Sequence, residues 1–359
     1  MKIVIAAGGT GGHIYPGIAI ANEIMRREPA SEVLFVGTAH GLETKIVPEN
    51  GFQLALIHSA GLKNVGFAGK VKGTLILPNS FLEARRLLRE FGPDVVVGAG
   101  GYVSGPVLLT AHFMGFPTLI MDSNAMPGFT NRRLARFVDR AALTFEETLP
   151  YFGFKGSVTG NPVRSEIFGV AERRPVSPFR VLLFGGSQGA RAINLAMIDA
   201  LPILQASGIE MVVTHQTGEA DFEKVKNAYD AVNWGDADIR PYISSIVDEY
   251  EKADLVICRA GATTCAEIAA AGKPALMVPL PGATDDHQRK NAEAMQRQGA
   301  VSVLLQAELT GERLAADLIG LLSEPDRLWE MGTCARKMAR PDAAEATVDI
   351  IESIRKGKS

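Results

Sequence analysis

Cysteine is scarce in this chain, and its spacing matches no known cysteine framework. The 359 residues include only Cys258, Cys265 and Cys334, and no two of them form a CxxC pair. A secreted disulfide framework and a structural zinc site both need paired cysteines at short spacings, so neither is indicated. This composition favours a reducing, cytoplasmic setting.

Net charge and long apolar runs are also lacking. The chain carries 37 basic and 40 acidic side chains, a net charge of −3, which gives no reason to expect nucleic acid as a partner. Two uncharged stretches, 3–22 and 95–121, are divided by glycine and proline into pieces of strand length. A membrane-spanning helix needs about 20 mainly apolar residues, so we expect no transmembrane segment and no signal peptide.

Glycine, by contrast, is abundant, and four glycines fall within five positions near the start. Five apolar residues (3–7) precede the loop Gly8-Gly-Thr-Gly-Gly12, and residues 14–25 carry apolar side chains at helical spacing. This pattern predicts a buried strand, a glycine turn and a helix N-terminus. Such a turn brings backbone N–H groups and the helix dipole close to an anion. For this segment alone, an ordinary tight turn is the alternative.

The same arrangement recurs half a chain later. The apolar residues 181–184 lead into Gly185-Gly-Ser-Gln-Gly189, and apolar side chains again follow at helical spacing. Two copies in the same order indicate two similar α/β domains, for which 359 residues suffice.

Apolar strand candidates alternate with amphipathic stretches throughout the chain. This alternation predicts doubly wound parallel sheets whose ligands lie at the carboxyl ends of the strands. We place the domains at 1–162 and 163–340, and we expect an amphipathic helix within 341–359, whose partner its periodicity does not reveal. The expected strands are 3–7, 33–36, 54–57, 94–97, 118–121, 142–144, 181–184, 211–214, 239–242, 255–258 and 275–278.

Neither glycine loop fits the common dinucleotide or mononucleotide motifs. In a GxGxxG fingerprint read from Gly9, the third glycine position is Ile14, and the second strand ends at Val36-Gly-Thr38 with no carboxylate for a ribose. No GxxxxGK[ST] sequence occurs. Asp236-Ala-Asp238 resembles a metal-binding pair, but it lies in a polar loop before a strand, so we expect no metal or other cofactor. Helix N-termini are expected to neutralise a diphosphate instead.

Three later segments add polar groups, each with an alternative interpretation. Glu267 stands one turn inside a predicted helix, where its carboxylate suits two ribose hydroxyls or simply favours the helix dipole. Gln288 and Asn291 share one face of a predicted helix, which either contacts a sugar or is simply exposed to solvent. Residues 60–89 carry six basic side chains and one acid among apolar residues, which suits either an anionic membrane surface or a loop and a core-facing helix.

Six motifs follow one another along the chain: GGTGGH (8–13), GAGGYVSGP (98–106), GNPVR (160–164), GGSQGA (185–190), RAGATTCAE (259–267) and DHQ with NA (286–292). Taken together, these motifs closely resemble the MurG family of peptidoglycan synthesis, over nearly the whole chain. The family is a UDP-N-acetylglucosamine:N-acetylmuramyl-(pentapeptide) pyrophosphoryl-undecaprenol N-acetylglucosamine transferase. The resemblance implies a GT-B architecture, a metal-independent inverting reaction, and a C-terminal helix that packs back on the first domain.

The resemblance also assigns site residues. It implies that the backbone of Ile243 contacts uracil, that Glu267 contacts ribose and that Ser187 contacts the diphosphate. His13 becomes the candidate base, and Asn291 is a weaker donor contact. The remaining residues expected at UDP-N-acetylglucosamine are Thr10, Gly11, Gly12, Asn124, Arg164, Ala262, Thr263, Thr264, Cys265, Ala266 and Gln288.

One segment departs from the family pattern. The usual His-Glu-Gln-Asn reads Met121-Asp-Ser-Asn124 here, which makes Asp122 a weak candidate for the base. His13 itself has a structural role as its alternative, because loop histidines often satisfy backbone groups.

The expected reaction moves N-acetylglucosamine from UDP-N-acetylglucosamine to the C4 hydroxyl of the muramyl sugar of lipid I, giving lipid II. The resemblance places this reaction at the cytoplasmic face of the inner membrane, with an anionic membrane surface and other cell-wall synthesis proteins as partners. Another lipid-linked acceptor, a nucleotide-sugar epimerase and a binding protein without turnover remain as alternatives.

Overall fold

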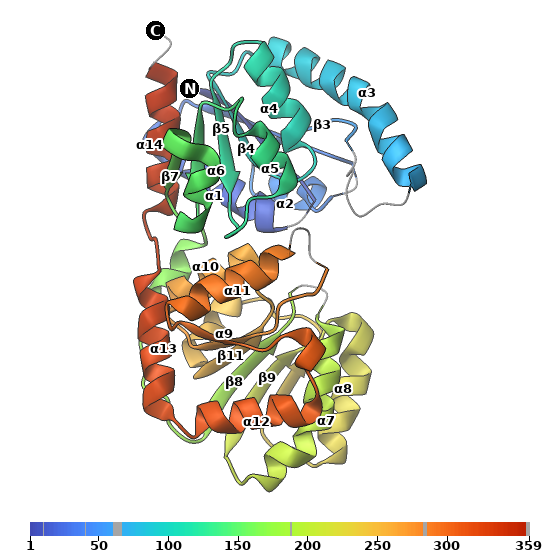
Figure 1. Ribbon diagram of the computed structural model, residues 1–359, viewed down its shortest axis with the longest axis vertical. Coiled ribbons are helices and arrows are strands. Elements are labelled where there is room, and N and C mark those ends of the chain that lie inside the picture. Colours follow the sequence, from blue (N-terminus) through green and yellow to red (C-terminus); the bar gives the residue numbers. More distant parts are fainter. Residues whose placement is uncertain (10, 40, 60–66, 187–188, 283–285, 357–359) are drawn as a thin grey trace. The chain divides into compact units, whose positions relative to one another are not determined.

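The computed structural model describes residues 1–9, 11–39, 41–59, 67–186, 189–282 and 286–356. Within these ranges it describes the side chains of all residues except 67–77 and 356. The chain divides into two compact units (Figure 1). The first combines Met1–Val163 with Arg340–Ser359, and the second is Arg164–Ala339.

The first unit is built on a parallel sheet, in which the described residues form seven strands in the order β3-β2-β1-β4-β5-β6-β7. Its strands are β1 (Lys2–Ala7), β2 (Glu32–Gly37), β3 (Gln53–Leu56), β4 (Val95–Gly100), β5 (Thr118–Asp122), β6 (Arg140–Leu143) and β7 (Gly156–Val158). Its helices include α1 (Gly11–Arg27), α2 (Glu43–Glu49), α3 (Phe67–Phe91), α4 (Ser104–Phe113), α5 (Phe129–Leu134), α6 (Leu149–Phe152) and α14 (Ala343–Lys356).

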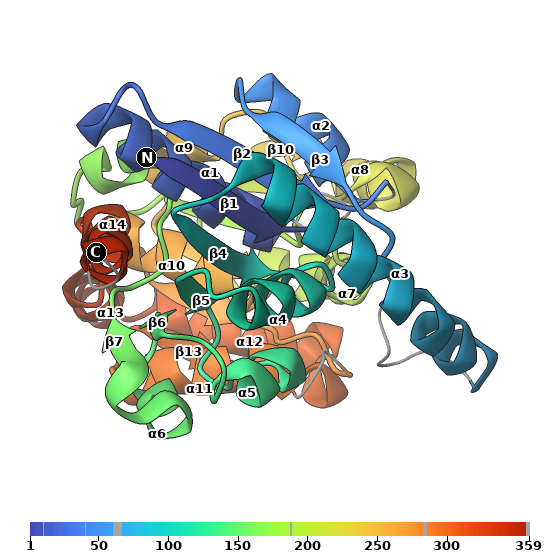
Figure 2. The same ribbon diagram turned by 90° about the horizontal axis from the view of Figure 1, so that it is seen from above.

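The apolar run of β1 is buried on both faces of this sheet. Ile3 and Ile5 belong to a core cluster shared with α1 and α14, whereas Val4 belongs to a second cluster shared with α3 and α4. Figure 2 shows α3 and α4 running beside each other. Because side chains alternate along a strand, a central parallel strand covered by helices on both faces needs a continuous apolar sequence.

The second unit repeats the design, and its described residues form six parallel strands in the order β10-β9-β8-β11-β12-β13. These are β8 (Phe179–Phe184), β9 (Met211–Gln216), β10 (Ala237–Arg240), β11 (Leu255–Cys258), β12 (Ala275–Met277) and β13 (Val301–Val303). The helices are α7 (Arg191–Ala206), α8 (Phe222–Ala231), α9 (Ile246–Lys252), α10 (Ala262–Ala271), α11 (His287–Arg297), α12 (Gly311–Leu322) and α13 (Pro325–Lys337).

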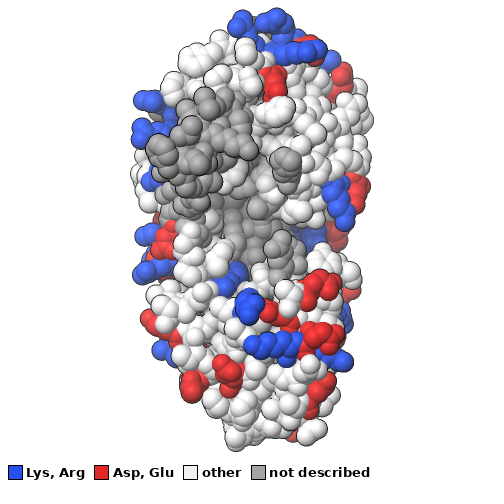
Figure 3. Space-filling view, turned by 90° about the vertical axis from the view of Figure 1, so that its right-hand side faces the viewer, with Lys and Arg blue, Asp and Glu red and all other residues white. Residues whose placement is uncertain are grey.

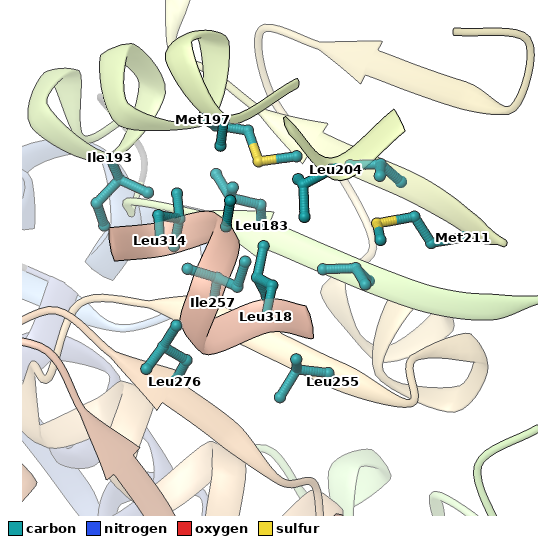
Figure 4. Packing of buried hydrophobic residues seen from close by; sticks show 14 of the residues in the cluster. Leu183, Ile193, Met197, Leu204, Met211, Leu255, Ile257, Leu276, Leu314 and Leu318 are labelled. Atoms are coloured by element: carbon teal, nitrogen blue, oxygen red, sulfur yellow. The ribbon is translucent and has the colours of Figure 1, made fainter. Parts of the chain in front are cut away.

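The core of the second unit lies between its sheet, α7 and α12. Figure 4 shows Met197 and Leu204 of α7 with Leu314 and Leu318 of α12, packed over strand residues such as Leu183. Burial of large aliphatic side chains of this kind contributes about 1.5–3 kcal/mol each relative to exposure.

The predicted pair of doubly wound parallel α/β domains is confirmed, with one local correction. The strand expected at 239–242 is β10, which begins two residues earlier, at Ala237. Asp238 therefore belongs to the strand rather than to a loop, and its carboxylate pairs with Arg240.

Among the described residues, no helix combines the length and the apolar character needed to cross a bilayer.

Candidate functional site

The first glycine loop is held in place by Glu43, the first residue of α2. Gly9 has φ = +91°, and its N–H donates to the buried carboxylate of Glu43 at 2.9 Å. Glu43 also accepts hydrogen bonds from the N–H and hydroxyl of Thr38, at the end of β2. Burial raises the pKa of Glu43, but these backbone donors outweigh it and leave the pKa lowered. The sequence analysis missed Glu43, whose partners lie on different loops.

His13, in the first turn of α1, lies directly against the β4–α4 connection. A Cβ atom on Gly100 would fall 2.2 Å from Nδ1 of His13, and one on Gly101 would fall 2.3 Å from the carbonyl oxygen of Gly8. Both glycines have positive φ, so they supply the close approach as well as the turn. Gly11 and Gly12 begin α1, and Thr10 lies outside the described residues. The carboxyl ends of β1 and β4 thus meet around the imidazole of His13.

Asp122 ends β5 and organises the loop that follows. Its carboxylate accepts hydrogen bonds from the N–H groups of Asn124 (3.0 Å) and Gly128 (3.2 Å) and from Nδ2 of Asn131 (2.9 Å). The side chain is buried, and burial raises its pKa to about 6 although these hydrogen bonds act in the opposite direction. Asp122 therefore positions Asn124, a residue expected to contact the donor, and its lone pairs are largely committed to its own loop.

In the second unit, a hydrogen bond links the two described sides of the glycine loop after β8. The carbonyl of Gly186 accepts the N–H of Gly189 at 2.9 Å. A Cβ on Gly189, where φ is +76°, would lie 1.9 Å from the carbonyl oxygen of Thr217, so this loop packs tightly on the end of β9. Ser187, the expected diphosphate contact, lies outside the described residues.

Glu267 and Arg164 are brought together as an ion pair. A guanidinium nitrogen of Arg164 lies 3.0 Å from one carboxylate oxygen of Glu267, and the hydroxyl of Tyr250 donates to the other at 3.3 Å. Burial raises the pKa of Glu267, while Arg164 and Tyr250 act to lower it. Glu267 lies beyond the first turn of α10, so the interpretation as a first-turn dipole residue is wrong. Tyr250 was missed because it is 17 residues away in the sequence.

The residues expected to contact the sugar in the first turns of α10 differ in their exposure. Ala262, Thr263, Thr264 and Ala266 are partly exposed, and the hydroxyl of Thr263 is buried without a hydrogen-bond partner among the described residues. Cys265 instead faces the core, and burial raises its thiol pKa to about 12. Only its backbone is therefore available to a ligand.

Gln288 and Asn291 both lie in α11, yet they have different surroundings. Oε1 of Gln288 accepts the N–H of Leu280 at 3.0 Å, and this side chain is partly exposed. Asn291 is fully buried, and its Nδ2 donates to the carbonyl of Ala260, just before α10. Gln288 thus remains accessible to a sugar, while Asn291 ties α11 to the start of α10.

Ile243, the residue expected at uracil, is buried just beyond β10. Its N–H donates to Oε1 of Gln216 at 3.0 Å, and the amide nitrogen of Gln216 donates to the carbonyl of Gly186 at 2.7 Å. The sequence analysis did not single out Gln216, because both partners lie about 30 residues away. Within the described parts of the chain, no group of three or more His, Cys, Asp and Glu side chains is placed to hold a metal ion.

Comparison with known proteins gives a consistent result over the whole chain. The glycosyltransferase family 28 N-terminal domain matches residues 3–143, and the family 28 C-terminal domain matches residues 180–347.

Two curated relatives share the name UDP-N-acetylglucosamine--N-acetylmuramyl-(pentapeptide) pyrophosphoryl-undecaprenol N-acetylglucosamine transferase. The one from Pelobacter propionicus is 46% identical, covering 98% of this chain and 99% of the relative. The one from Geobacter sulfurreducens is 45% identical, covering 99% and 100%. The crystal structure of Acinetobacter baumannii MurG superposes with a TM-score of 0.81 at 31% identity, covering 98% of this chain and 99% of that one.

Proposed function

The chain belongs to glycosyltransferase family 28, and from this membership we infer that it transfers N-acetylglucosamine from UDP-N-acetylglucosamine to lipid I. The acceptor atom is the C4 hydroxyl of the muramyl sugar, and the product is lipid II. The observation that carries this conclusion is the near-full-length similarity to relatives named for this reaction. The resemblance read from the sequence motifs is thereby confirmed.

We propose that the second unit supplies the groups that stabilise the leaving nucleotide. In an inverting transfer, the acceptor oxygen bonds to C1 of the sugar while the bond from C1 to the β-phosphate oxygen breaks. The electron pair of that bond leaves with UDP, so negative charge develops on the diphosphate. The ten-residue helix α10 has no acid in its first turn, and its N-terminus suits this charge. We propose that Glu267 binds the ribose hydroxyls, and its hydrogen bonds with Arg164 and Tyr250 support this role by fixing the carboxylate.

For the first unit, we propose His13 as the base that takes the acceptor proton. Its imidazole lies at the carboxyl edge of the sheet, packed on Gly100. The carboxylate of Asp122 accepts two hydrogen bonds from the loop after β5 and one from Asn131 of α5, which favours a positioning role for that residue. The transition state is oxocarbenium-like, and general base catalysis typically contributes about 10²–10⁴-fold in rate.

We also propose that the first unit binds the cytoplasmic face of the inner membrane peripherally. In the second half of α3, Ala84 and Leu88 are buried, whereas Arg85, Arg86 and Arg89 are exposed. Arg86 pairs with Glu90 at 2.8 Å, and the exposed basic face suits anionic headgroups. Figure 3 shows Lys and Arg side chains gathered at the upper edge of this unit.

Aromatic side chains support the same membrane proposal. Phe113, at the end of α4, is 73% exposed, and its ring lies 6.2 Å from that of Phe137, over which Arg136 stacks. Exposed aromatic rings beside cations are typical of surfaces that sit at the membrane interface.

The experiment that tests the function measures UDP release from UDP-N-acetylglucosamine, in excess chelator, with and without a lipid I analogue. We expect release that requires the analogue and is unaffected by the chelator. Conversion of the donor without any acceptor would indicate an epimerase. Donor binding without analogue-dependent release would mean that the acceptor is a different lipid-linked sugar or that the protein binds without turnover.

A further inference from the structure

Gln216 lies between the two segments that are expected to bind the diphosphate and the uracil of the donor. It is the last residue of β9, and its neighbours across the sheet are Phe184 at the end of β8 and Arg240 at the end of β10. The chain after β8 forms the second glycine loop, and the chain after β10 leads to Ile243. Gln216 therefore occupies the sheet position between the expected diphosphate loop and the expected base-recognition segment.

Both ends of the Gln216 amide are used, one toward each segment. The nitrogen Nε2 donates to the carbonyl of Gly186 at 2.7 Å, and the oxygen Oε1 accepts the N–H of Ile243 at 3.0 Å. The side chain is 4% exposed. A buried primary amide that is satisfied in this way holds two backbone segments at a set spacing, because losing either bond leaves a buried polar group unpaired.

The residues around Gln216 reinforce this link. The N–H of Thr217 donates to the carbonyl of Arg240, and the N–H of Gly218 donates to that of Pro241, both at 3.0 Å. On the other side, Gly189 packs directly on the carbonyl of Thr217. The end of β9 is thus hydrogen-bonded to the segment after β10 and packed against the loop after β8.

We propose that Gln216 is a positioning residue for the sugar-nucleotide donor. It sets the distance between the glycine loop and Ile243, so that a ligand spanning diphosphate and uracil meets both ends of its site already in place. Such preorganisation lowers the ordering cost of binding, and the benefit is largest for a ligand that uses both ends. The inference rests on the proposed function, because it takes UDP-N-acetylglucosamine as the donor.

The test compares UDP, which spans both ends, with uridine, which lacks the diphosphate. Gln216→Met keeps the length of the side chain and removes both hydrogen bonds. We expect the Kd for UDP to rise about tenfold and the Kd for uridine to rise less than threefold. The matched control is Gln205→Met, because the exposed Gln205 also donates to a backbone carbonyl, that of Val232. It should leave both constants and the thermal midpoint unchanged.

A second variant separates the two hydrogen bonds. Gln216→Glu retains an acceptor for the N–H of Ile243 but loses the donor to Gly186 and adds negative charge beside the diphosphate loop. We expect a larger loss of UDP affinity than in Gln216→Met, with uridine binding again little changed. In the wild-type protein without ligand, the amide of Ile243 should exchange its hydrogen slowly, a measurement that does not depend on how the variants fold.

Three results would overturn this role: wild-type UDP affinity in both variants, an equal loss of UDP and uridine binding, or fast exchange at Ile243. A wild-type protein that fails to bind UDP would instead refute the proposed function. The two failures are therefore distinguishable.

Discussion

At the scale of single residues, Asp122 couples the stability of the first unit to pH. Burial raises its pKa to about 6 in the folded protein, from an ordinary value of 3.8. Because the folded state holds the proton more tightly, the stabilisation from this group is fully present below its ordinary pKa. It is lost as the pH rises through about 6.

We therefore predict that Asp122→Asn, which cannot titrate, removes this pH dependence. We compare the free energies of unfolding of the two proteins. The value for the wild type minus the value for the variant should fall by about 1–3 kcal/mol between pH 4 and pH 7 and stay constant above pH 7. Urea denaturation of both proteins across this range measures it. A difference that is constant or increases with pH would show that Asp122 does not titrate in this way.

His13 carries the second prediction at this scale. His13→Ala should lower turnover at saturating substrate by about 10²–10⁴-fold, because the acceptor proton loses its base, with little change in the KM for the donor. His112→Ala is the control, because this imidazole stacks on Phe113 and Phe137 away from the glycine loop. If the His13 variant turned over at nearly the wild-type rate, His13 would be a structural residue.

At the scale of elements, the connection between β4 and α4 positions His13. Gly100→Ala would place a methyl group 2.2 Å from Nδ1 of His13 on a backbone with φ = +126°. We predict a loss of turnover comparable to that of His13→Ala. Gly92→Ala is a matched control, because Gly92 also has positive φ (+62°) but no atom within 4 Å of an added Cβ. It should cost about 1 kcal/mol of stability and leave turnover unchanged. Equal kinetics in both variants would exclude the positioning role.

Local pattern also explains which elements were predicted. The strands with four or more apolar residues, such as β1 and β8, stand out because both of their faces are buried. The edge strands β7 and β13 were not predicted, since each has three residues and its sequence, Gly-Ser-Val or Val-Ser-Val, lacks a continuous apolar run. Their pairing with β6 and β12 comes from the neighbouring strand rather than from their own sequence.

At the scale of the whole molecule, the C-terminal helix belongs to the core of the first unit. Val348 and Ile351 of α14 are buried with residues of β1 and α1. Arg27 of α1 also reaches α14, pairing with Asp349 at 2.6 Å and with Glu352 at 3.4 Å. We therefore expect α14 to stabilise the first unit.

Because each unit has its own core, we predict two thermal transitions. Ile351→Ala should destabilise the first unit by about 2–5 kcal/mol and lower only one transition. UDP should raise the other, since a ligand stabilises the unit that binds it. Scanning calorimetry of both proteins, with and without UDP, measures this. A single transition that both changes shift together would show that the units unfold as one.

Sequence alone determined the parallel α/β class, the two glycine loops and the family. These depend on properties of short segments: apolar runs, the steric freedom of glycine and motifs in a set order. Only the tertiary structure decided that Asp122 binds the loop that follows it and that Gln216 joins Gly186 to Ile243. The resemblance placed the C-terminal helix on the first domain, and the structure identified α1 as its partner there. The partners of Gln216 and α14 are distant in the sequence and meet through strand order and core packing. A carboxylate or amide side chain can form hydrogen bonds with many different groups, and the fold decides which of these groups lie within reach.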